Sequence, residues 1–479
     1  MAKDFSVFEF VADTRKDSPE GRKTGVPFHL LEQNACLRVS WGDGTDSMLT
    51  PSLYARDDAS CAEHEYASPG RYRVAVYAAA GCRWEDIYLS TLDCQDADFE
   101  LSRGFNAKME CIRLFKKTLV EMSAPLPPFK GTLQFYTTAP DRLFSGTPVK
   151  ANFSYVFLHC TALEKVADNL FEGIRNSASF AYAFYGCRSL KTISESLFKG
   201  CTEAEEFTYA FFGCSSVRFI PSNLFKDTYK ARIFKGCFKD CSNIEELPRN
   251  LFRGAPIAEL FSDCFQNCIS LKSIPRSLFA HNPLAVSFSR TFENCSSLTA
   301  VPRTLFWNCP SASFFKSTFS KTGLTSIPAE LFYGCPNAYT FSHAFAWCRD
   351  ITEVPEGLFA EAGRADSFFG CFCGCTSLER IGRKLFERCI SVRTFNTCFY
   401  GCERLLNVRL DLPSRSIDNV HLMFDQDANA DRVLYVSKAS SVAKMLKLKE
   451  RELSVRVEER LFLIATLKTL VKALFSLPH

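Results

Sequence analysis

Arginine recurs at one position of a repeated sequence, where it could hold an anionic ligand. It follows a proline in three consecutive repeats and returns later at the equivalent position: these residues are Arg249, Arg276, Arg303 and Arg383. The guanidinium group suits carboxylates, sulfates and phosphates, so stacked repeats would form a basic stripe that fits an acidic glycan or an acidic protein surface. The alternative is a solvated turn that tolerates arginine, because other repeats hold Ser222, Ala329 and Glu356 at this position.

Cysteine is the second recurring residue with chemical potential. Of the 23 cysteines, at least nine share one repeat position: Cys160, Cys187, Cys214, Cys241, Cys268, Cys295, Cys348, Cys375 and Cys402. We interpret them as small buried hydrophobic residues that stack in a ladder. Disulfides between neighbours are an alternative, because stacked coils would place them roughly 5 Å apart. Pairs spaced by four, such as Cys237 and Cys241, lack a histidine or a second CxxC motif nearby, so we expect no metal.

No catalytic motif accompanies these residues. The sequence has no glycine-rich phosphate loop, nucleophile elbow, HExxH motif or kinase signature. The seven histidines are scattered without repeating partners. We therefore predict a protein that is not an enzyme and needs no cofactor. The formal net charge of +4 gives no electrostatic argument for binding nucleic acid.

A repeat of about 27 residues positions the arginines and cysteines. Leu-Phe pairs end at Phe144, Phe171, Phe198, Phe225, Phe252, Phe279, Phe306, Phe332, Phe359 and Phe386. Between them runs the phrase Phe-x-x-Cys-x-x-Leu-x-x-Ile-Pro, complete from Phe265 to Pro275. This periodicity predicts a solenoid. In each coil we expect a short strand ending at the proline, and a helical or 3₁₀ turn where phenylalanines are spaced like Phe288 and Phe292.

The register of the repeat slips once, near Thr322. A threonine occupies the cysteine position there, and the leucine that follows, Leu324, comes one residue early. Loss of a core position would misalign the stack, so we predict a shortened surface turn in this coil.

The first part of the chain, residues 1–95, carries no repeat and is predicted to be β. Apolar and polar residues alternate over 37–41 and 72–76, as in half-buried strands. The segment 41–45 reads Trp-Gly-Asp-Gly-Thr, and its Asp43 is interpreted as a turn residue that bonds nearby backbone amides, rather than a calcium ligand or catalytic acid. With the phrase His-x-Tyr-x-x-Pro-Gly-x-Tyr-x-Val from His64, this segment resembles the polycystic-kidney-disease (PKD) type of immunoglobulin-like domain, which implies a β-sandwich.

The repeats over 96–408 resemble the BspA-like leucine-rich-repeat family of bacterial and some protist surface proteins. The resemblance rests on the phrase F-x-x-C-x-S-L-x-x-I-P and the phenylalanine-rich returns. It implies a leucine-rich-repeat solenoid that binds a host protein or a glycan on a cell surface. A second hypothesis is a bacteriophage virion component, such as a tail-fibre or receptor-binding subunit. The N-terminus lacks the features of a secretory signal, so the location stays open between the cell surface and a virion.

The C-terminal part of the chain is predicted to close the solenoid. Residues 409–457 suggest a capping module with strands at 433–436 and 453–457 around a helix that starts near Ser440. Residues 458–479 predict an amphipathic helix whose leucines follow a 4-3-4-3 spacing: Leu463, Leu467, Leu470, Leu474 and Leu477. This helix would pack on the solenoid end or join a homo-oligomer. A transmembrane span is the least favoured alternative, because two lysines interrupt a short apolar stretch.

Overall fold

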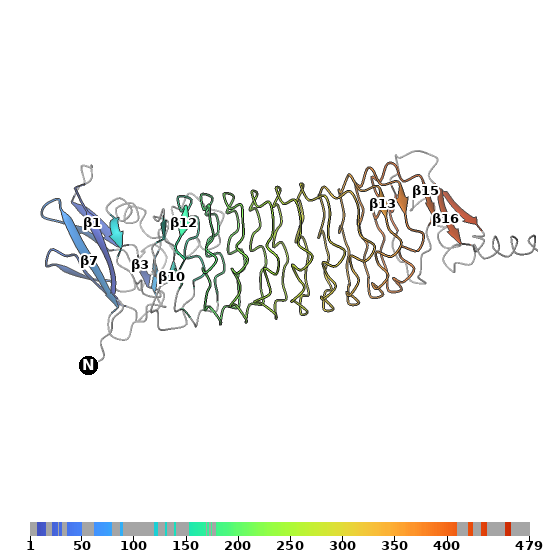
Figure 1. Cartoon of the computed structure of the whole chain (residues 1–479). Coiled ribbons are helices and arrows are strands. Elements are labelled where there is room, and N and C mark those ends of the chain that lie inside the picture. The colour runs from blue at the N-terminus through green and yellow to red at the C-terminus, as the bar shows by residue number, and fades with distance from the viewer. Residues whose placement is uncertain are drawn as a thin grey trace, which may run out of the picture. The chain divides into compact units, whose positions relative to one another are not determined.

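A computed structural model divides the chain into two compact units, Met1–Leu271 and Lys272–His479. The structure describes residues 7–15, 22–26, 28–30, 36–49, 62–78, 87–89, 119–122, 130–131, 138–139, 153–168, 170–171, 174, 179–409, 420–424, 433–437 and 456–460. Within each unit, successive repeats form coils whose backbones run side by side (Figure 1). The regular elements among these residues are strands, and no helix occurs among them.

The N-terminal part of the first unit is built of β-strands. They are β1 (Val7–Asp13), β2 (Lys23–Val26), β3 (Phe28–Leu30), β4 (Leu37–Ser40), β5 (Asp46–Leu49), β6 (Ala62–Glu65), β7 (Arg71–Ala78), β8 (Ile87–Leu89), β9 (Leu119–Met122), β10 (Lys130–Gly131) and β11 (Thr138–Ala139). An antiparallel sheet has the order β5-β4-β7-β1-β9, and smaller sheets join β10-β8-β3 and β2-β6. Strands β4 and β7 confirm the two predicted from alternation, whereas the PKD-like sandwich stays a prediction.

The turn after β4 is held by its aspartate. Asp43 Oδ1 accepts hydrogen bonds from the backbone N–H of Thr45 (3.0 Å) and from its hydroxyl (2.6 Å). Nε2 of His64 lies 2.7 Å from Oδ2 of Asp43, and the imidazole stacks on Trp41 with centroids 5.0 Å apart. Burial alone would raise the pKa of Asp43, but the hydrogen bonds from Thr45 and His64 outweigh it and lower the pKa to about 2. These contacts match the structural role expected for this aspartate.

Three columns of phenylalanine make the core of the coils. In the first unit, Phe198 of a Leu-Phe pair stacks on Phe225 of the next coil, with centroids 5.9 Å apart. Its ring also meets Phe207 of a second column edge-on at 4.9 Å. The second unit repeats this arrangement, for example between Phe332 and Phe359 at 5.8 Å. The described Leu-Phe phenylalanines are all buried, which confirms that the repeated phrase marks the core.

The segment predicted to form a helical turn is instead a series of β-turns. Within a coil, the N–H of Ala183 donates to Phe180 O, whereas the N–H of Tyr182 donates to Thr208 O in the next coil. Two residues per coil, four positions apart, adopt positive φ, as do Tyr182 (57°) and Gly186 (72°). A right-handed helix cannot contain such residues, so the spacing of four that suggested a helix reflects two successive turns.

The predicted strand before the proline is reduced to one or two paired residues. It forms β12 (Lys165–Val166), which pairs in parallel with β11, and β13 (Glu353–Val354), which pairs with β14 (Arg380–Ile381). In other coils it is an isolated bridge, as between Phe219 and Glu246. Each coil is therefore mainly turns joined by short parallel ladders.

The repeated cysteines point into the core, where their thiols donate hydrogen bonds to backbone carbonyl groups. The thiol of Cys241 donates to Phe211 O at 3.0 Å, and that of Cys375 donates to Phe345 O at 3.2 Å. The described cysteines form no disulfide with one another, and all but Cys36 and Cys373 are buried. Burial is the main reason why the pKa of the Cys375 thiol is raised well above its ordinary value. The repeated cysteines thus form the predicted ladder of small buried residues.

The short coil keeps its core and loses a surface residue. Thr322 is buried and its hydroxyl donates to Phe319 O at 2.7 Å, while Leu324 remains fully buried. One residue, Gly323, replaces the two exposed residues found at this turn in the preceding coil, Ser296 and Ser297. A Cβ on Gly323 would lie 2.5 Å from Ser296 O, so only glycine fits the tightened turn. The predicted shortened surface turn is confirmed.

The C-terminal strands form a parallel sheet in the order β15 (Asn407–Arg409), β16 (Val433–Ser437) and β17 (Arg456–Arg460). Strand β16 confirms the prediction at 433–436, whereas β17 begins three residues later than the predicted 453–457. The predicted helices near Ser440 and over 458–479, with their leucines, lie outside the described residues. The domain boundaries after residues 95, 408 and 457 stay predictions.

Removing one ring from a phenylalanine column is expected to destabilise the coils around it. Phe225→Ala should cost about 3–5 kcal/mol, because the cavity loses contacts with rings on both sides. Phe219→Ala removes a ring that is 66% exposed and should change stability by less than about 0.5 kcal/mol. Hydrogen exchange of peptides from 190–260 measures both, and equal effects would contradict the column arrangement.

The thiols are expected to differ sharply in reactivity. Iodoacetamide at neutral pH should label half-buried Cys373 in the native protein, and should label its buried neighbours Cys371 and Cys375 only after unfolding in urea. Mass-spectrometric mapping of the labelled peptide over time resolves the three sites. Comparable native labelling of all three would show that the ladder is not buried.

Candidate binding surface

The predicted arginines lie on the turn that follows the Ile-Pro or Leu-Pro segment. In the first unit Arg249 is exposed, and in the second unit Arg276 and Arg303 are exposed while Arg383 is half-buried. The three exposed guanidinium groups form no ion pair with another described residue. Their position on a turn was predicted correctly, and their grouping into one stripe stays a prediction.

The structure places Arg249 in a basic hollow of the first unit. The hollow has a volume of about 620 Å³ and is lined by Ser222, Asn223, Lys226, Tyr229, Arg249, Asn250, Leu251, Arg253 and Gly254. Three of these side chains are cationic, and no carboxylate is among them. We call this set the basic hollow.

Gly254, which lines the basic hollow, allows two coils to approach closely there. A Cβ on this residue would lie 2.0 Å from Phe225 O and 2.4 Å from Lys226 O. The backbone at Gly254 therefore packs directly against the preceding coil at the residue that carries the Lys226 side chain. This close approach brings Arg253 beside Lys226 in one concavity.

A second basic column was missed from the sequence. The residue directly after the Leu-Phe pair is Lys199, Lys226 and Arg253 in three consecutive coils, and all three are exposed. The sequence carries this signal, because a basic residue directly follows Leu-Phe in three consecutive repeats. In the second unit the same position holds Trp307 and Tyr333, whose rings meet at 5.7 Å and are 44% and 56% exposed.

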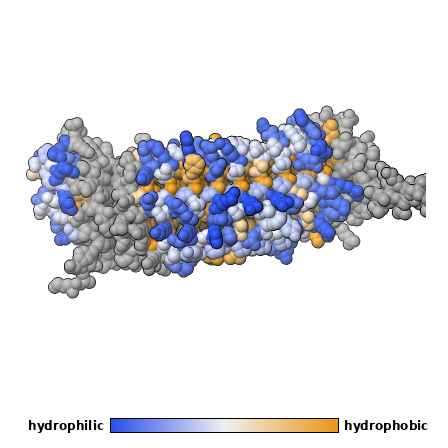
Figure 2. All heavy atoms as spheres, viewed as in Figure 1, coloured by the Kyte–Doolittle hydropathy of each residue, from blue (hydrophilic) through white to orange (hydrophobic). Residues whose placement is uncertain are grey.

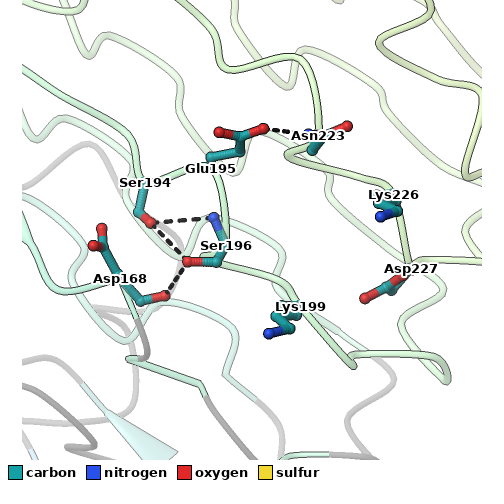
Figure 3. A pocket seen from close by; sticks show the side chains of 8 residues that line it. All are labelled: Asp168, Ser194, Glu195, Ser196, Lys199, Asn223, Lys226 and Asp227. Atoms are coloured by element: carbon teal, nitrogen blue, oxygen red, sulfur yellow. Dashed lines mark hydrogen bonds between the residues drawn. The ribbon is translucent and has the colours of Figure 1, made fainter.

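A neighbouring hollow of about 370 Å³ carries charges of both signs (Figure 3). It is lined by Asp168, Ser194, Glu195, Ser196, Lys199, Asn223, Lys226 and Asp227. The Ser196 hydroxyl donates to Asp168 O at 2.9 Å, and the Asn223 amide donates to Glu195. Asp227 Oδ2 accepts a hydrogen bond from the backbone N–H of Gly200 at 3.0 Å. Because carboxylates accompany the lysines, this hollow suits an anion less than the basic hollow does.

Three other cations of the first unit are neutralised by glutamates along the ladders. Lys191 pairs with Glu164 at 2.8 Å, Lys230 with Glu203 at 2.6 Å and Arg232 with Glu259 at 2.6 Å, each between adjacent coils. On the face shown in Figure 2, hydrophilic side chains gather in rows on both sides of an apolar band. Lys226, Arg249 and Arg253 differ from the ladder residues because they have no ion-pair partner among the described residues.

Comparison with protein families matches the BspA type leucine rich repeat region in six copies. The overlapping matches span residues 152–309, 209–338 and 262–393, which together cover half of the chain. The chain belongs to this family. The repeat solenoid expected from the 27-residue period is thereby confirmed, and BspA-type repeats suggest a binding or adhesion surface. No curated protein matches the chain significantly.

The part of the chain that the structure describes lacks two further features, a metal-binding cluster and a membrane-spanning helix. No group of three or more histidine, cysteine, aspartate or glutamate side chains there is arranged to hold a metal ion. No helix among the same residues is long and apolar enough to cross a membrane.

The close approach at Gly254 gives a test of the basic hollow's construction. Gly254→Ala should destabilise this coil by about 1–3 kcal/mol, because backbone carbonyl groups leave no room for a methyl group. Gly357→Ala is the control, since a Cβ there would be 3.6 Å from the nearest atom. Hydrogen exchange of the peptides around each site is the measurement. Equal protection in both variants would contradict the tight packing.

Proposed function

We propose that this BspA-type repeat protein is a non-enzymatic binding protein that holds an anionic glycan of a cell surface in the basic hollow of its first unit. Sulfate and carboxylate groups of such a chain would pair with Lys226, Arg249 and Arg253. The observation that carries the proposal is the clustering of three cations in one concavity whose lining contains no carboxylate.

The remaining lining of the basic hollow suits a sugar chain as well as its charges. Ser222, Asn223 and Asn250 offer neutral hydrogen-bonding groups, and Tyr229 is 52% exposed beside them. Hydroxyl and amide groups can bond to sugar hydroxyls, and an exposed phenol ring offers an apolar face. An acidic protein segment would pair with the three cations, but it has fewer hydroxyl groups to bond to the neutral side chains of the hollow.

The solenoid supports binding spread over several coils. Each coil contacts its neighbours through the core, so outward residues can add contacts to a long ligand without altering the stack. In the second unit, exposed Arg276 and Arg303 offer the same chemistry on successive coils of that unit. Oligomerisation through residues 458–479 would raise avidity further, and rests on the leucine spacing alone.

The test is the binding of a sulfated or uronic-acid glycan panel by the full chain. The triple variant Lys226→Ser, Arg249→Ser and Arg253→Ser should lose affinity about tenfold or more, because three charged contacts of roughly 0.5–1 kcal/mol each are removed. The dependence of affinity on salt should also flatten. Titration calorimetry at two salt concentrations measures both effects.

The matched control removes the same charge from the ladders, as Lys191→Ser, Lys230→Ser and Arg232→Ser. These residues are already paired with glutamates, so their loss should change glycan affinity less than threefold, or about 0.7 kcal/mol. Equal losses in both triples would show that bulk charge alone drives binding. Binding of acidic peptides in preference to glycans, or no loss in the first triple, would reject the proposed ligand or its site.

A further inference from the structure

The second unit exposes aromatic rings of a different character from the basic hollow. Trp347, Phe369 and Tyr400 are 45%, 39% and 38% exposed, and they lie on the phenylalanine-rich turns of three successive coils. Backbone hydrogen bonds join these turns: the N–H of Trp347 donates to Cys373 O at 2.6 Å, and that of Gly374 donates to Tyr400 O at 2.7 Å. The three rings are therefore carried by adjoining backbone.

Glycine in the following coil makes room for the rings. A Cβ on Gly374 would lie 2.5 Å from the six-membered ring of Trp347, and a Cβ on Gly370 would lie 2.5 Å from the imidazole of His343. Each ring thus lies against bare backbone of its neighbour, which limits its motion. Yet the indole remains almost half exposed. A large apolar ring that is fixed in place and left open to solvent is typical of a recognition surface.

The polar groups around these rings are mostly neutral. The imidazole of His343 contacts Phe369 edge-on at 5.0 Å, and its pKa is lowered, first by burial and then by Lys316. A neutral imidazole offers one donor and one acceptor. Beside it, the hydroxyl groups of Ser342 and Ser367 lie 2.9 Å apart. Arg349 places its guanidinium 5.9 Å from the centre of the Trp347 indole and adds donors at the edge.

We propose that Trp347, Phe369, Tyr400 and His343 form an aromatic platform that binds an uncharged sugar ring of a glycan. The C–H face of a pyranose packs on an aromatic ring, and its hydroxyl groups bond to neighbouring imidazole, hydroxyl and guanidinium groups. The platform combines these two kinds of group, because the imidazole of His343, the hydroxyl groups of Ser342 and Ser367 and the guanidinium of Arg349 lie on the same turns as the exposed rings. The platform lies in the second unit rather than the first, consists of aromatic instead of cationic side chains, and is proposed to bind a neutral sugar instead of an anionic one.

The experiment uses the full chain and a panel of neutral oligosaccharides of glucose, mannose, galactose and N-acetylglucosamine. Trp347→Ala should weaken binding of the best panel member about tenfold or more, as expected for truncation of a central tryptophan. Trp307→Ala is the matched control, because that ring is 44% exposed in the same unit but follows a Leu-Phe pair. It should change affinity less than about twofold. Circular dichroism verifies that both variants stay folded.

The outcomes separate this platform from the proposed anionic site. The triple variant of the basic hollow should keep its affinity for the neutral sugar, and Trp347→Ala should keep its affinity for the anionic glycan. Tyr400→Ala gives an independent measurement should Trp347→Ala unfold, and is expected to weaken binding as well. No binding by the native protein across the panel, or equal effects of Trp347→Ala and Trp307→Ala, would overturn the platform.

Discussion

Alternating backbone hydrogen bonds in the phenylalanine-rich turns hold each coil to the next. One N–H closes a turn within its own coil, and the following one donates to the adjacent coil. The alternation requires two residues of positive φ in every coil, a conformation that side chains other than glycine adopt at a cost of about 1–3 kcal/mol. The positions of positive φ nevertheless include residues with large side chains, such as Tyr209, Arg290 and Trp347. Stacking on both sides must over-determine the backbone there, so stability is shared between coils rather than held within one.

The core was predictable because its residues keep their spacing. A period of 27 residues places like side chains above one another, so phenylalanine and cysteine could be assigned inward positions from the sequence. The shortened coil at Thr322 was predictable for the same reason, since a slip that spares the leucine must fall in a surface turn. The turns themselves were not. A spacing of four, as between Phe288 and Phe292, fits a helix as well as two β-turns. A tyrosine, arginine or tryptophan in the sequence also does not predict a positive φ at its position.

Part of the candidate site was predictable from the repeat. Alignment of the repeats identified Arg249 as a solvent-facing residue, because a turn after a proline faces solvent, and a guanidinium group indicated an anionic ligand. It did not reveal that Lys226 and Arg253 share a concavity with that arginine. Their proximity depends on how closely Gly254 approaches the Phe225 and Lys226 carbonyl groups, a distance between coils that no spacing within one coil encodes. The ion pairs of Lys191 and Arg232 are likewise contacts between coils, so the sequence could not separate neutralised cations from free ones.

The outward positions of the coil carry different chemistry without disturbing the stack. The residue after the Leu-Phe pair is Lys226 in one coil and Trp307 in another, while the phenylalanine beside it stays buried in both. Outward residues can therefore differ from coil to coil with little effect on the free energy of unfolding, because they do not contact the core. The exceptions are the glycines on which side chains or neighbouring backbone rest, such as Gly254 and Gly374. At those positions a larger residue would push the neighbouring coil or its side chain away. The shape of a binding surface that includes such a glycine therefore depends on the glycine, and substitutions at other outward positions do not recreate it.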